Sequence, residues 1–464
     1  MVMRQGADGD GIPTGQLKRS IPIVRLAVRT SGEEVLATLR RRPVPPETYV
    51  RRADRYVEVL GRSKGALMKA AQMMSIVPVL NNEDPGAQAA FQAALTRLQA
   101  DAPPMAPELA VQVIEQDLGL SPERAFAEFD PEPMAAASIG QVHLARHHDG
   151  RALAVKVQYP GVAEAIRSDL RNTELMMVFM QLMRAVAPPL TRSNPKALAA
   201  EISTRIKEEL DYRLEASNQA FFAEAYRGHP FIRVPEVVTE LSGSMVLTQE
   251  YAAGVHWAEA MTADQSLRND WGETIYRFAH GNLRRFGRYN ADPHPGNYVF
   301  HLDGPVSFLD FGCVKRVDAG WITMIKEITR AAISQDGEAL WRVLVEGGTF
   351  DAKSGLSSDE LAEHFSARIN LFTGPQPFAI SPEMLAGMID HEFSTRGHAS
   401  KWVRSIKNSD AWIFYMRLEL GVYGILAGLG SVNEGLAIAK EMDMSGPVLT
   451  PLGQANAAYW AART

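Results

Sequence analysis

The sequence has few of the features that mark secreted or membrane-spanning proteins. Its 464 residues contain one cysteine, Cys313, so no disulfide can form within the chain and a reducing compartment is expected. The start of the chain lacks a long apolar core followed by small residues, so a secretory signal is not expected. The most apolar run, 412–429, contains Arg417 and Glu419 and therefore predicts a buried amphipathic helix instead of a transmembrane segment. These absences predict a cytoplasmic protein.

The composition is that of a globular protein. Apolar residues make up 46% and charged residues 22%, which excludes a disordered chain and a collagen-like fibre. The 48 Lys and Arg against 54 Asp and Glu give a net charge of −6, which argues against nucleic acid as a partner. The length is about three times that of a usual domain of roughly 150 residues, so two or three packed units are expected.

The charge is unevenly distributed along the chain. Residues 1–69 contain 14 Lys and Arg and 7 Asp and Glu, so this part carries +7 and the remainder −13. One interpretation is a solvated helix face that forms ion pairs with the acidic body of the same protein. The other is a leader that lies against an anionic membrane surface, which would place the protein peripherally on the inner face of a membrane.

The apolar periodicity divides the chain into helical and strand-rich parts. Helices are expected over 45–100, 107–118, 162–187, 195–223 and most of the chain after 254. Short strands are expected at 125–129, 141–146, 152–158 and 245–249, and a hairpin at 298–309 around Asp303-Gly304. The outline is an α+β fold with a small sheet-plus-helix lobe, a larger helical lobe and a helical extension in front. The expected boundaries are a basic leader at 1–44, the extension at 45–122, an N-lobe at 123–251 and a C-lobe at 252–464.

The most specific motif is the loop Asp292-Pro-His-Pro-Gly-Asn297, followed by the hairpin and then by Asp310-Phe-Gly312. Phosphoryl transfer from a nucleotide needs metal ions that neutralise phosphate charge and a carboxylate near the accepting oxygen. The Asp-to-Asn spacing matches a kinase catalytic loop, and Asp-Phe-Gly matches the kinase metal motif. We therefore expect Asp292 to orient the attacking hydroxyl or water, and Asn297 and Asp310 to bind Mg²⁺. His294 is expected to shape the loop instead of relaying protons.

A matching phosphate ligand lies upstream. Lys156, in Ala-Val-Lys near the end of a predicted strand, stands where kinases place the lysine that pairs with nucleotide phosphates. The segment 135–140 occupies the place of a glycine-rich loop, although alanine restricts the backbone more than glycine does. Glu250, at the end of the next strand, is expected at a hinge where backbone groups would face adenine. The residues expected to contact the nucleotide are Ala135, Ala136, Ala137, Ser138, Gly140, Lys156 and Glu250.

A predicted helix that includes residues 208–216 is rich in carboxylates. Asp211 and Glu215 are four residues apart and share a face, whereas Glu209 lies about 120° around the helix from Glu215. One helix can therefore serve two different cations. Glu208 is interpreted as part of a charged, solvated face.

These motifs make the chain similar to the UbiB/AarF/ADCK family of atypical kinases, protein-kinase-like proteins tied to coenzyme Q biosynthesis and lipid metabolism. The resemblance covers roughly residues 20–350. It rests on Lys69-Ala-Ala-Gln72, AAASIGQVH at 135–143, Val155-Lys156-Val157, Glu209-Leu-Asp211 with Glu215 and Asn218, Asp292–Asn297 and Asp310-Phe-Gly312. It implies a bilobal kinase-like fold, with ATP and Mg²⁺ as cofactors.

The resemblance also implies a regulatory extension. In that family a lysine and a glutamine of the N-terminal extension fold over the cleft, and Lys69 and Gln72 match them. The family pattern would pair Lys69 with Glu209 and Lys156 with Glu215. The residues given a regulatory role by the resemblance are Lys69, Gln72, Glu209 and Asp211.

The sequence departs from the expected patterns at three places. Ala71 replaces the glycine that is usual before the glutamine, and Asn290 stands where the family often has His, which weakens a role for that position. After Gly312 the chain passes within a few residues into a helical pattern at 320–332, and no Ala-Pro-Glu motif follows. Because protein kinases dock their peptide substrates on this missing activation segment, phosphorylation of proteins in trans is not expected.

The favoured function is an atypical kinase or ATPase that acts in ubiquinone (isoprenoid lipid) biosynthesis or lipid homeostasis. The lipid connection comes from the resemblance, which implies membrane lipid or quinone-biosynthesis enzymes as partners. Two alternatives remain open: a nucleotide-gated, non-catalytic scaffold for lipid enzymes, and a small-molecule phosphotransferase of the aminoglycoside or choline kinase type. The latter would share the pattern at 292–297 but would not be expected to carry Lys69 and Gln72.

Overall fold

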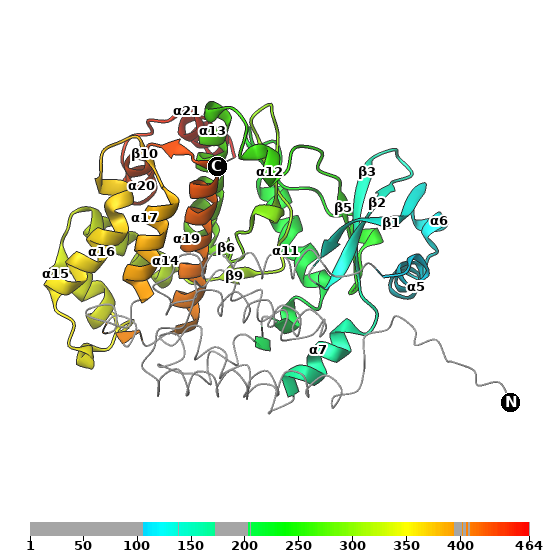
Figure 1. The fold of residues 1–464 in the computed structure, drawn as a ribbon, viewed down its shortest axis with the longest axis horizontal. Helices are drawn as coiled ribbons and strands as arrows, with labels where there is room; N and C mark the ends of the chain where they lie inside the picture. Colours follow the sequence, from blue (N-terminus) through cyan, green and yellow to red (C-terminus); the bar gives the residue numbers. More distant parts are fainter. Residues whose placement is uncertain are drawn as a thin grey trace, which may run out of the picture.

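The computed structural model of the chain describes residues 105–463 except 138, 172–202, 205, 394–400, 402–404 and 407–408. The described part has a small lobe built around an antiparallel sheet and a larger lobe made mostly of helices (Figure 1). Helices α11 (Tyr212–Ala225) and α12 (Trp257–Ala260) lie between the two. This arrangement confirms the expected α+β bilobal fold.

The small lobe contains a four-stranded sheet in which every neighbouring pair is antiparallel. In spatial order the strands are β1 (Glu128–Ala137), β2 (Gly140–Arg146), β3 (Ala152–Gln158) and β5 (Val246–Glu250). Leu153, Val155 and Val157 alternate along β3 and are fully buried in the core. Because side chains alternate across a strand, Ala154 and Lys156 lie on the opposite face. This face of the sheet turns towards the larger lobe, because Lys156 meets residues of that lobe there.

Helix α5 (Pro107–Leu118) confirms the helix predicted over 107–118 and packs against three strands of the sheet. In its last turn, Asp117 accepts hydrogen bonds from Ser244 N at 3.1 Å and Ser244 Oγ at 2.8 Å. The same carboxylate accepts the N–H groups of Met245 at 2.7 Å and Val246 at 2.9 Å. One side chain thus satisfies the backbone donors that precede β5 and fixes α5 to the sheet.

The larger lobe is organised around two long helices that pack against each other, α13 (Gln265–Phe286) and α19 (Ser409–Leu429). The other α-helices of the described ranges, in either lobe, are α6 (Pro122–Ala125), α7 (Val162–Arg171), α14 (Ala319–Ile333), α15 (Gly337–Trp341), α16 (Ser358–Thr373), α17 (Pro382–Phe393), α20 (Gly435–Met444) and α21 (Pro451–Ala461). Short strands are β4 (Ile232–Arg233), β6 (Arg288–Asn290), β7 (Tyr298–Phe300), β8 (Val306–Phe308), β9 (Val314–Arg316), β10 (Phe378–Ala379) and β11 (Val432–Asn433). Strands β7 and β8 pair antiparallel and confirm the predicted hairpin.

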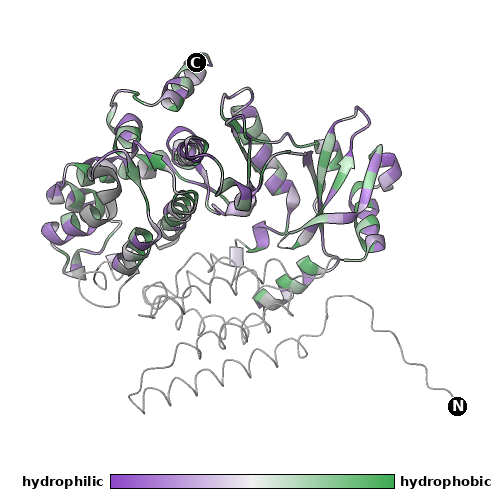
Figure 2. Cartoon of the chain, turned by 45° about the horizontal axis from the view of Figure 1, so that its top comes forward, coloured by the Kyte–Doolittle hydropathy of each residue, from purple (hydrophilic) through white to green (hydrophobic). Residues whose placement is uncertain are grey.

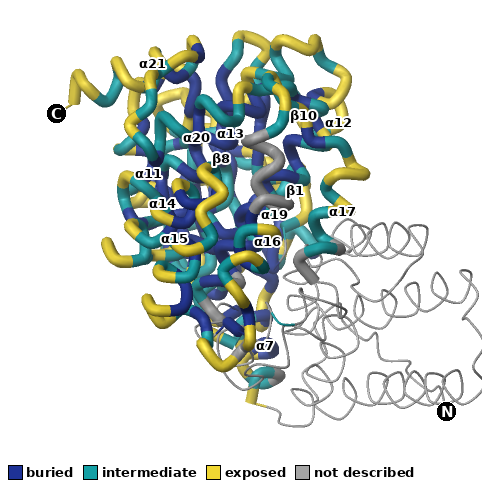
Figure 3. Tube along the Cα trace, turned by 90° about the vertical axis from the view of Figure 1, so that its left-hand side faces the viewer, coloured by how far each residue is buried: buried dark blue, intermediate teal, exposed yellow. Residues whose placement is uncertain are grey.

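Buried ion pairs fasten α13 to α20 in the larger lobe. Much of α13 is coloured as buried in Figure 3. Arg277 pairs with Glu273 at 2.7 Å and with Glu441 at 2.8 Å. Two turns further on, Arg284 pairs with Asp443 at 2.5 Å. Removing one partner of a buried pair leaves an uncompensated charge and typically costs about 3–5 kcal/mol. These pairs therefore fix α20 in place on α13.

The apolar run 412–429 lies within α19, and most of its described side chains are buried in the larger lobe. Hydrophilic and hydrophobic residues are mixed along the helices of this lobe (Figure 2). None of the helices in the described ranges combines the length and the hydropathy needed to cross a bilayer. The prediction of a buried helix at this position is confirmed.

The carboxylate of Asp117 gives a direct test of how α5 is held. Asp117→Ala leaves the four donors at the start of β5 without their acceptor, so we expect the free energy of unfolding to fall by about 2–3 kcal/mol. Glu115→Ala, an exposed change in the same helical turn, is the matched control and should change stability by less than about 0.5 kcal/mol. Urea denaturation measures both variants, and equal losses would contradict the assignment.

Candidate active site

Three segments that are far apart in the sequence meet at Lys156. Its Nζ lies 2.9 Å and 3.0 Å from the two carboxylate oxygens of Glu215, and 3.4 Å from Oδ2 of Asp310. Lys156 comes from β3, Glu215 from α11 and Asp310 from the segment that follows β8. The ring centroid of Tyr212 lies 5.0 Å from the ammonium. The structure therefore brings together the predicted phosphate ligand, its glutamate partner and the predicted metal ligand.

Burial sets the protonation behaviour of this cluster. It raises the pKa of Glu215 to about 7, against the opposing effect of Lys156, and the charge of Asp310 adds to the rise. Burial also disfavours the charge of Lys156, but Asp310 and Glu215 outweigh it and raise the pKa of Lys156 well above its ordinary value. The lysine is thus a fixed cation whose charge two carboxylates share.

The Asp-Phe-Gly segment is held by contacts of the two residues that follow Asp310. Phe311 is fully buried and stacks on Phe222, with 5.2 Å between the ring centroids. The amide of Asn218 donates to the carbonyl oxygen of Phe311 at 3.2 Å, and the N–H of Gly312 donates to Oδ1 of Asp310 at 3.0 Å. The Asp310 side chain remains 34% exposed, so a ligand can reach its oxygens.

The loop 292–297 is held by its own polar groups. Asn297 Nδ2 donates to the carbonyl oxygen of Asp292 at 3.1 Å, which leaves its amide oxygen for a ligand. The N–H of Gly296 donates to Nδ1 of His294 at 3.1 Å, as expected for a histidine that shapes the loop.

Asn290 joins this loop to the Asp-Phe-Gly segment, although its departure from the usual His had weakened the expectation of a role for this position. Its Nδ2 donates to the carbonyl oxygen of Asp310 at 2.5 Å, and its Oδ1 accepts the N–H of Asp292 at 3.0 Å. A single side chain therefore links the two segments that carry the predicted catalytic and metal-binding carboxylates. An amide makes both bonds at once because it is donor and acceptor together.

The side chain of Asp292 contacts a residue that sequence reasoning did not assign to chemistry. Arg417 of α19 donates from Nη2 to Oδ1 of Asp292 at 2.5 Å. The arginine side chain is 10% exposed and the aspartate side chain 28%. The sequence did contain a signal, because a charged residue inside an apolar helical run needs a charged partner when water cannot solvate it.

The alanine-rich segment is the end of a strand, where the sequence predicted a loop. Residues 135–137 belong to β1 and pair with residues 140–142 of β2, so the two strands are joined by residues 138 and 139. The predicted strand at 125–129 was therefore wrong in extent. A Cβ on Gly140 would lie 2.2 Å from the carbonyl oxygen of Val157, so this glycine allows β2 to approach β3 closely.

An apolar surface adjoins Lys156 on the sheet. In the β2–β3 register, Val142 lies opposite Lys156 and Leu144 lies opposite Ala154, so all four side chains share one face. Leu144 is 40% exposed there. The place of Ala154 on this face could have been predicted from the sequence, because it lies two residues before Lys156 in the same strand. This surface offers a place for a flat, apolar ring.

The Gly-Gln-Val-His block at 140–143 contributes buried structural contacts on the opposite face of the sheet. Gln141 Nε2 and His143 Nε2 lie 2.9 Å apart, and His143 Nδ1 lies 2.9 Å from the carbonyl oxygen of Asp130. Gln141 Oε1 also accepts the N–H of Met105 at 2.9 Å. Burial lowers the pKa of His143. The two side chains join β2 to β1 and to the start of the described chain.

The carboxylate-rich helix is interrupted where the sequence predicted a continuous one. Residues 209 and 210 form a turn, and Asp211 caps α11 by accepting the N–H of Arg213 at 3.0 Å. The prediction that Asp211 and Glu215 share a helix face was therefore wrong. Glu209 and Glu215 both border Gly312, at 3.8 Å and 3.6 Å from the position of a Cβ there, so the two carboxylates lie beside one segment.

The remaining predicted residues have other surroundings or are not described. The N–H of Glu250 donates to the carbonyl oxygen of Glu236 at 2.9 Å, and its carboxylate accepts from Arg151 at 3.0 Å. Its own amide is therefore already used within the protein. Lys69, Gln72 and Ser138 lie outside the described residues, as does the basic leader.

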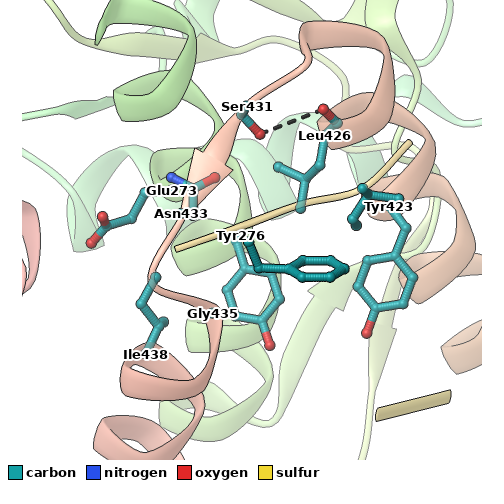
Figure 4. Close-up of a pocket in the computed structure, with 10 residues that line it drawn as sticks. Glu273, Tyr276, Tyr423, Leu426, Ser431, Asn433, Gly435 and Ile438 are labelled. Carbon is teal, nitrogen blue, oxygen red and sulfur yellow. Dashed lines mark hydrogen bonds between the residues drawn. The ribbon is translucent and has the colours of Figure 1, made fainter. Parts of the chain in front are cut away.

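Two hollows lie away from the Lys156 cluster, with which they share no residue. The smaller is an apolar cavity of about 40 Å³ in the larger lobe, between Tyr276 of α13, Tyr423 of α19 and Ile438 of α20 (Figure 4). It is far too small for a nucleotide. The larger, about 520 Å³, is a groove beside Glu250 and His229.

The donor set at Asp310 and Asn297 fits a magnesium–nucleotide complex. Magnesium is usually bound by one or two carboxylates together with phosphate oxygens and water, and it seldom occupies an all-protein cage. Asp310 offers exposed carboxylate oxygens and Asn297 an amide oxygen. Across the described ranges, no group of three or more His, Cys, Asp or Glu side chains could hold a metal by itself.

A small antiparallel sheet with a strand lysine bonded to a helix glutamate, facing an Asp-Phe-Gly segment, defines a kinase-like fold. A family profile described as the ABC1 atypical kinase-like domain matches residues 97–344, more than half of the chain. The chain belongs to this family, which confirms the resemblance to the UbiB/AarF/ADCK proteins.

Characterised and uncharacterised relatives agree with this assignment. The chain is 29% identical to the mitochondrial atypical kinase COQ8B of Rattus norvegicus over 80% of its own length and 69% of the relative. It is 35% identical to the uncharacterized protein sll0005 of Synechocystis over 48% of its length, but it spans only 32% of that protein. The solved structure of Rv3197 from Mycobacterium tuberculosis, a complex with erythromycin, is 28% identical with a TM-score of 0.61. That match covers 89% of this chain and 98% of the other.

The raised pKa of Glu215 predicts a specific pH dependence of stability. Between the ordinary glutamate value near 4.5 and about 7, the folded protein retains a proton on Glu215 that the unfolded chain releases. The contribution of this group to the free energy of unfolding should therefore fall as pH rises through that window and level off above it. Urea denaturation of the wild type and Glu215→Gln at several pH values isolates the effect. A stability difference that does not change with pH would contradict it.

Proposed function

We propose that the protein binds ATP with Mg²⁺ and transfers or hydrolyses its terminal phosphoryl group as an atypical kinase or ATPase. The observation that carries the proposal is the convergence of Lys156, Glu215 and Asp310 within 3.4 Å of one ammonium nitrogen. In the structural pairs of Arg277 both carboxylates are largely buried, whereas in this cluster the Asp310 side chain is 34% exposed. The exposed edge of Asp310 and the apolar surface at Leu144 are consistent with a ligand that has a charged and a flat part.

Each group has a role that follows from its chemistry. Lys156, oriented by Glu215, would bind the phosphates, while Asp310 and Asn297 would hold the metal that neutralises phosphate charge. Asp292 would orient the hydroxyl or water that attacks. We keep Glu209 and Asp211, with Lys69 and Gln72, as proposed regulatory residues on the strength of the family.

The segment after the metal motif is short, which argues against phosphorylation of protein substrates. Strand β9 begins at Val314, two residues after Gly312, and α14 begins at Ala319. Six residues therefore separate Gly312 from the next helix, which is too few for a peptide-docking platform of the protein kinase type. A small hydroxyl-bearing acceptor or water suits this arrangement better.

We also propose a role in ubiquinone or related isoprenoid lipid metabolism. The domain boundaries that we propose are an extension at 45–122, an N-lobe at 123–251 and a C-lobe at 252–464. The name of the relative COQ8B and the family membership support this placement. Lipid or quinone-biosynthesis enzymes would be the partners. The basic leader at 1–44 would supply a peripheral membrane contact, because clustered Arg and Lys are attracted to anionic lipid surfaces.

ATP hydrolysis by the full-length protein, with and without anionic liposomes, tests the proposal. Asp310→Asn removes a metal-binding charge, and we expect it to lower kcat about 100-fold or more. Asp303→Asn, an exposed aspartate in the β7–β8 connection, is the matched control and should retain wild-type rates. Stimulation by liposomes would support the lipid role.

The other outcomes identify the alternatives. Tight ATP binding with no hydrolysis that depends on Asp310, under any lipid condition, would overturn the enzymatic proposal and leave a nucleotide-gated scaffold. Rapid phosphorylation of a soluble alcohol would favour a small-molecule phosphotransferase.

A further inference from the structure

The contact between Arg417 and Asp292 joins the proposed catalytic loop to a helix 125 residues further along the chain. Arg417 lies in the middle of α19, in surroundings that are otherwise largely apolar. A buried guanidinium is costly unless it is paired, because it loses the water that would solvate it. Its charge is balanced first by Asp292, with a smaller contribution from Glu209.

The backbone of α19 is built to reach this loop. Gly421 lies one helical turn after Arg417 and therefore on the same face. A Cβ at Gly421 would lie 2.3 Å from Cγ of Pro293, so only glycine lets the helix lie this close to the loop. Two contacts on one face, at Asp292 and at Pro293, hold α19 against the loop.

The loop has no cation of its own. Its six residues, Asp-Pro-His-Pro-Gly-Asn, include neither Lys nor Arg. Burial lowers the pKa of His294, and its Nδ1 accepts the N–H of Gly296, so this ring is a neutral acceptor. Phosphoryl transfer develops negative charge on the transferred group and on the groups around it, and that charge needs compensation.

Arg417 has donors to spare. Nη2 is bonded to Asp292, while Nε is buried and has no hydrogen-bond partner among the described residues. An unused guanidinium donor next to a proposed phosphoryl-transfer site is unusual, since most buried polar groups are paired. Arg417 therefore bonds Asp292 through one donor while another of its donors stays unsatisfied within the described residues.

We propose that Arg417 is a positioning residue of the phosphoryl-transfer site, which holds Asp292 through Oδ1 and supplies the positive charge that the loop lacks. With Oδ1 occupied, Asp292 presents Oδ2 to the attacking hydroxyl or water. The inference rests on the proposed function and assigns to α19 a part in it.

The test compares Arg417→Gln and Arg417→Lys with the wild type in the full-length protein, with Arg284→Gln as the matched control. Arg284 is another arginine of the larger lobe, equally exposed at 10% and paired with one aspartate, but its partner is Asp443 of α20, which belongs to none of the motifs. We expect Arg417→Gln to lower kcat for ATP hydrolysis by about 10- to 100-fold, with KM and the affinity for a fluorescent ATP analogue changed less than about 3-fold. Arg417→Lys, which keeps the charge but loses the planar fork, should recover part of the rate.

A double-mutant cycle separates positioning from a merely structural role. If Arg417 acts through Asp292, Arg417→Gln should lower kcat by less than about 3-fold in an Asp292→Asn background, because the two losses overlap. Multiplicative losses would overturn the inference. So would a pattern in which Arg417→Gln, like Arg284→Gln, lowers the melting temperature and leaves kcat of the folded fraction at the wild-type value.

A second readout avoids dependence on turnover. Aluminium fluoride with Mg²⁺ and fluorescent ADP mimics the transferred phosphoryl group, and Arg417→Gln should weaken the trapping of this ADP at least about 10-fold while leaving the affinity for ADP alone unchanged.

The outcomes separate this inference from the proposed function. If Asp310→Asn changes neither readout, the proposed function fails and this inference falls with it. If Asp310→Asn abolishes both but Arg417→Gln changes neither, only the inference is overturned. Should Arg417→Gln yield no folded protein, Arg417→Lys decides, since a wild-type kcat and wild-type trapping in that variant would overturn the inference.

Discussion

The ion pair between Lys156 and Glu215 is the interaction on which the rest of the site depends. It joins a strand of the small lobe to α11, and Asp310 brings the larger lobe to the same nitrogen. Because all three groups are ionisable and the lysine and glutamate are largely buried, removing a carboxylate leaves the buried lysine with less compensation for its charge. The relative position of the two lobes is therefore coupled to the charge state of a few atoms.

The polar contacts near this cluster are of two kinds: some hold the segments that carry the carboxylates, and one compensates the charge of a carboxylate. Asn290, Asn218 and the backbone of Gly312 hold the segments that carry the carboxylates, while Arg417 compensates the charge of Asp292. Gly312 and Asn290 lie two residues from Asp310 and Asp292, respectively, whereas Asn218 and Arg417 come from the distant helices α11 and α19. The chemistry is local, but its geometry is set by contacts between distant elements.

Sequence reasoning found the residues that motif spacing determines and missed those that only folding brings together. Lys156, Glu215 and Asp310 each lie in a recognisable local pattern, so their meeting could be predicted, and α5 and β3 followed from periodicity. Arg417 gave no local signal beyond a charge in an apolar helix. The break before α11 was missed because the carboxylate-rich segment favours helix, although Asp211 is a typical N-cap residue. The alanines of β1 were taken for a loop because their pairing with β2 is decided by register, which the sequence does not display.

The close approach of Gly421 to Pro293 has a consequence for how this protein can vary. The helix that carries Arg417 is seated by the absence of a side chain, so a single added methyl group would displace the helix axis without altering any charged atom. The contact between Arg417 and Asp292 would then be weakened, although neither residue had been substituted. Which substitutions this face of α19 tolerates is therefore decided by side-chain size, even though the contact that the face makes with Asp292 is electrostatic.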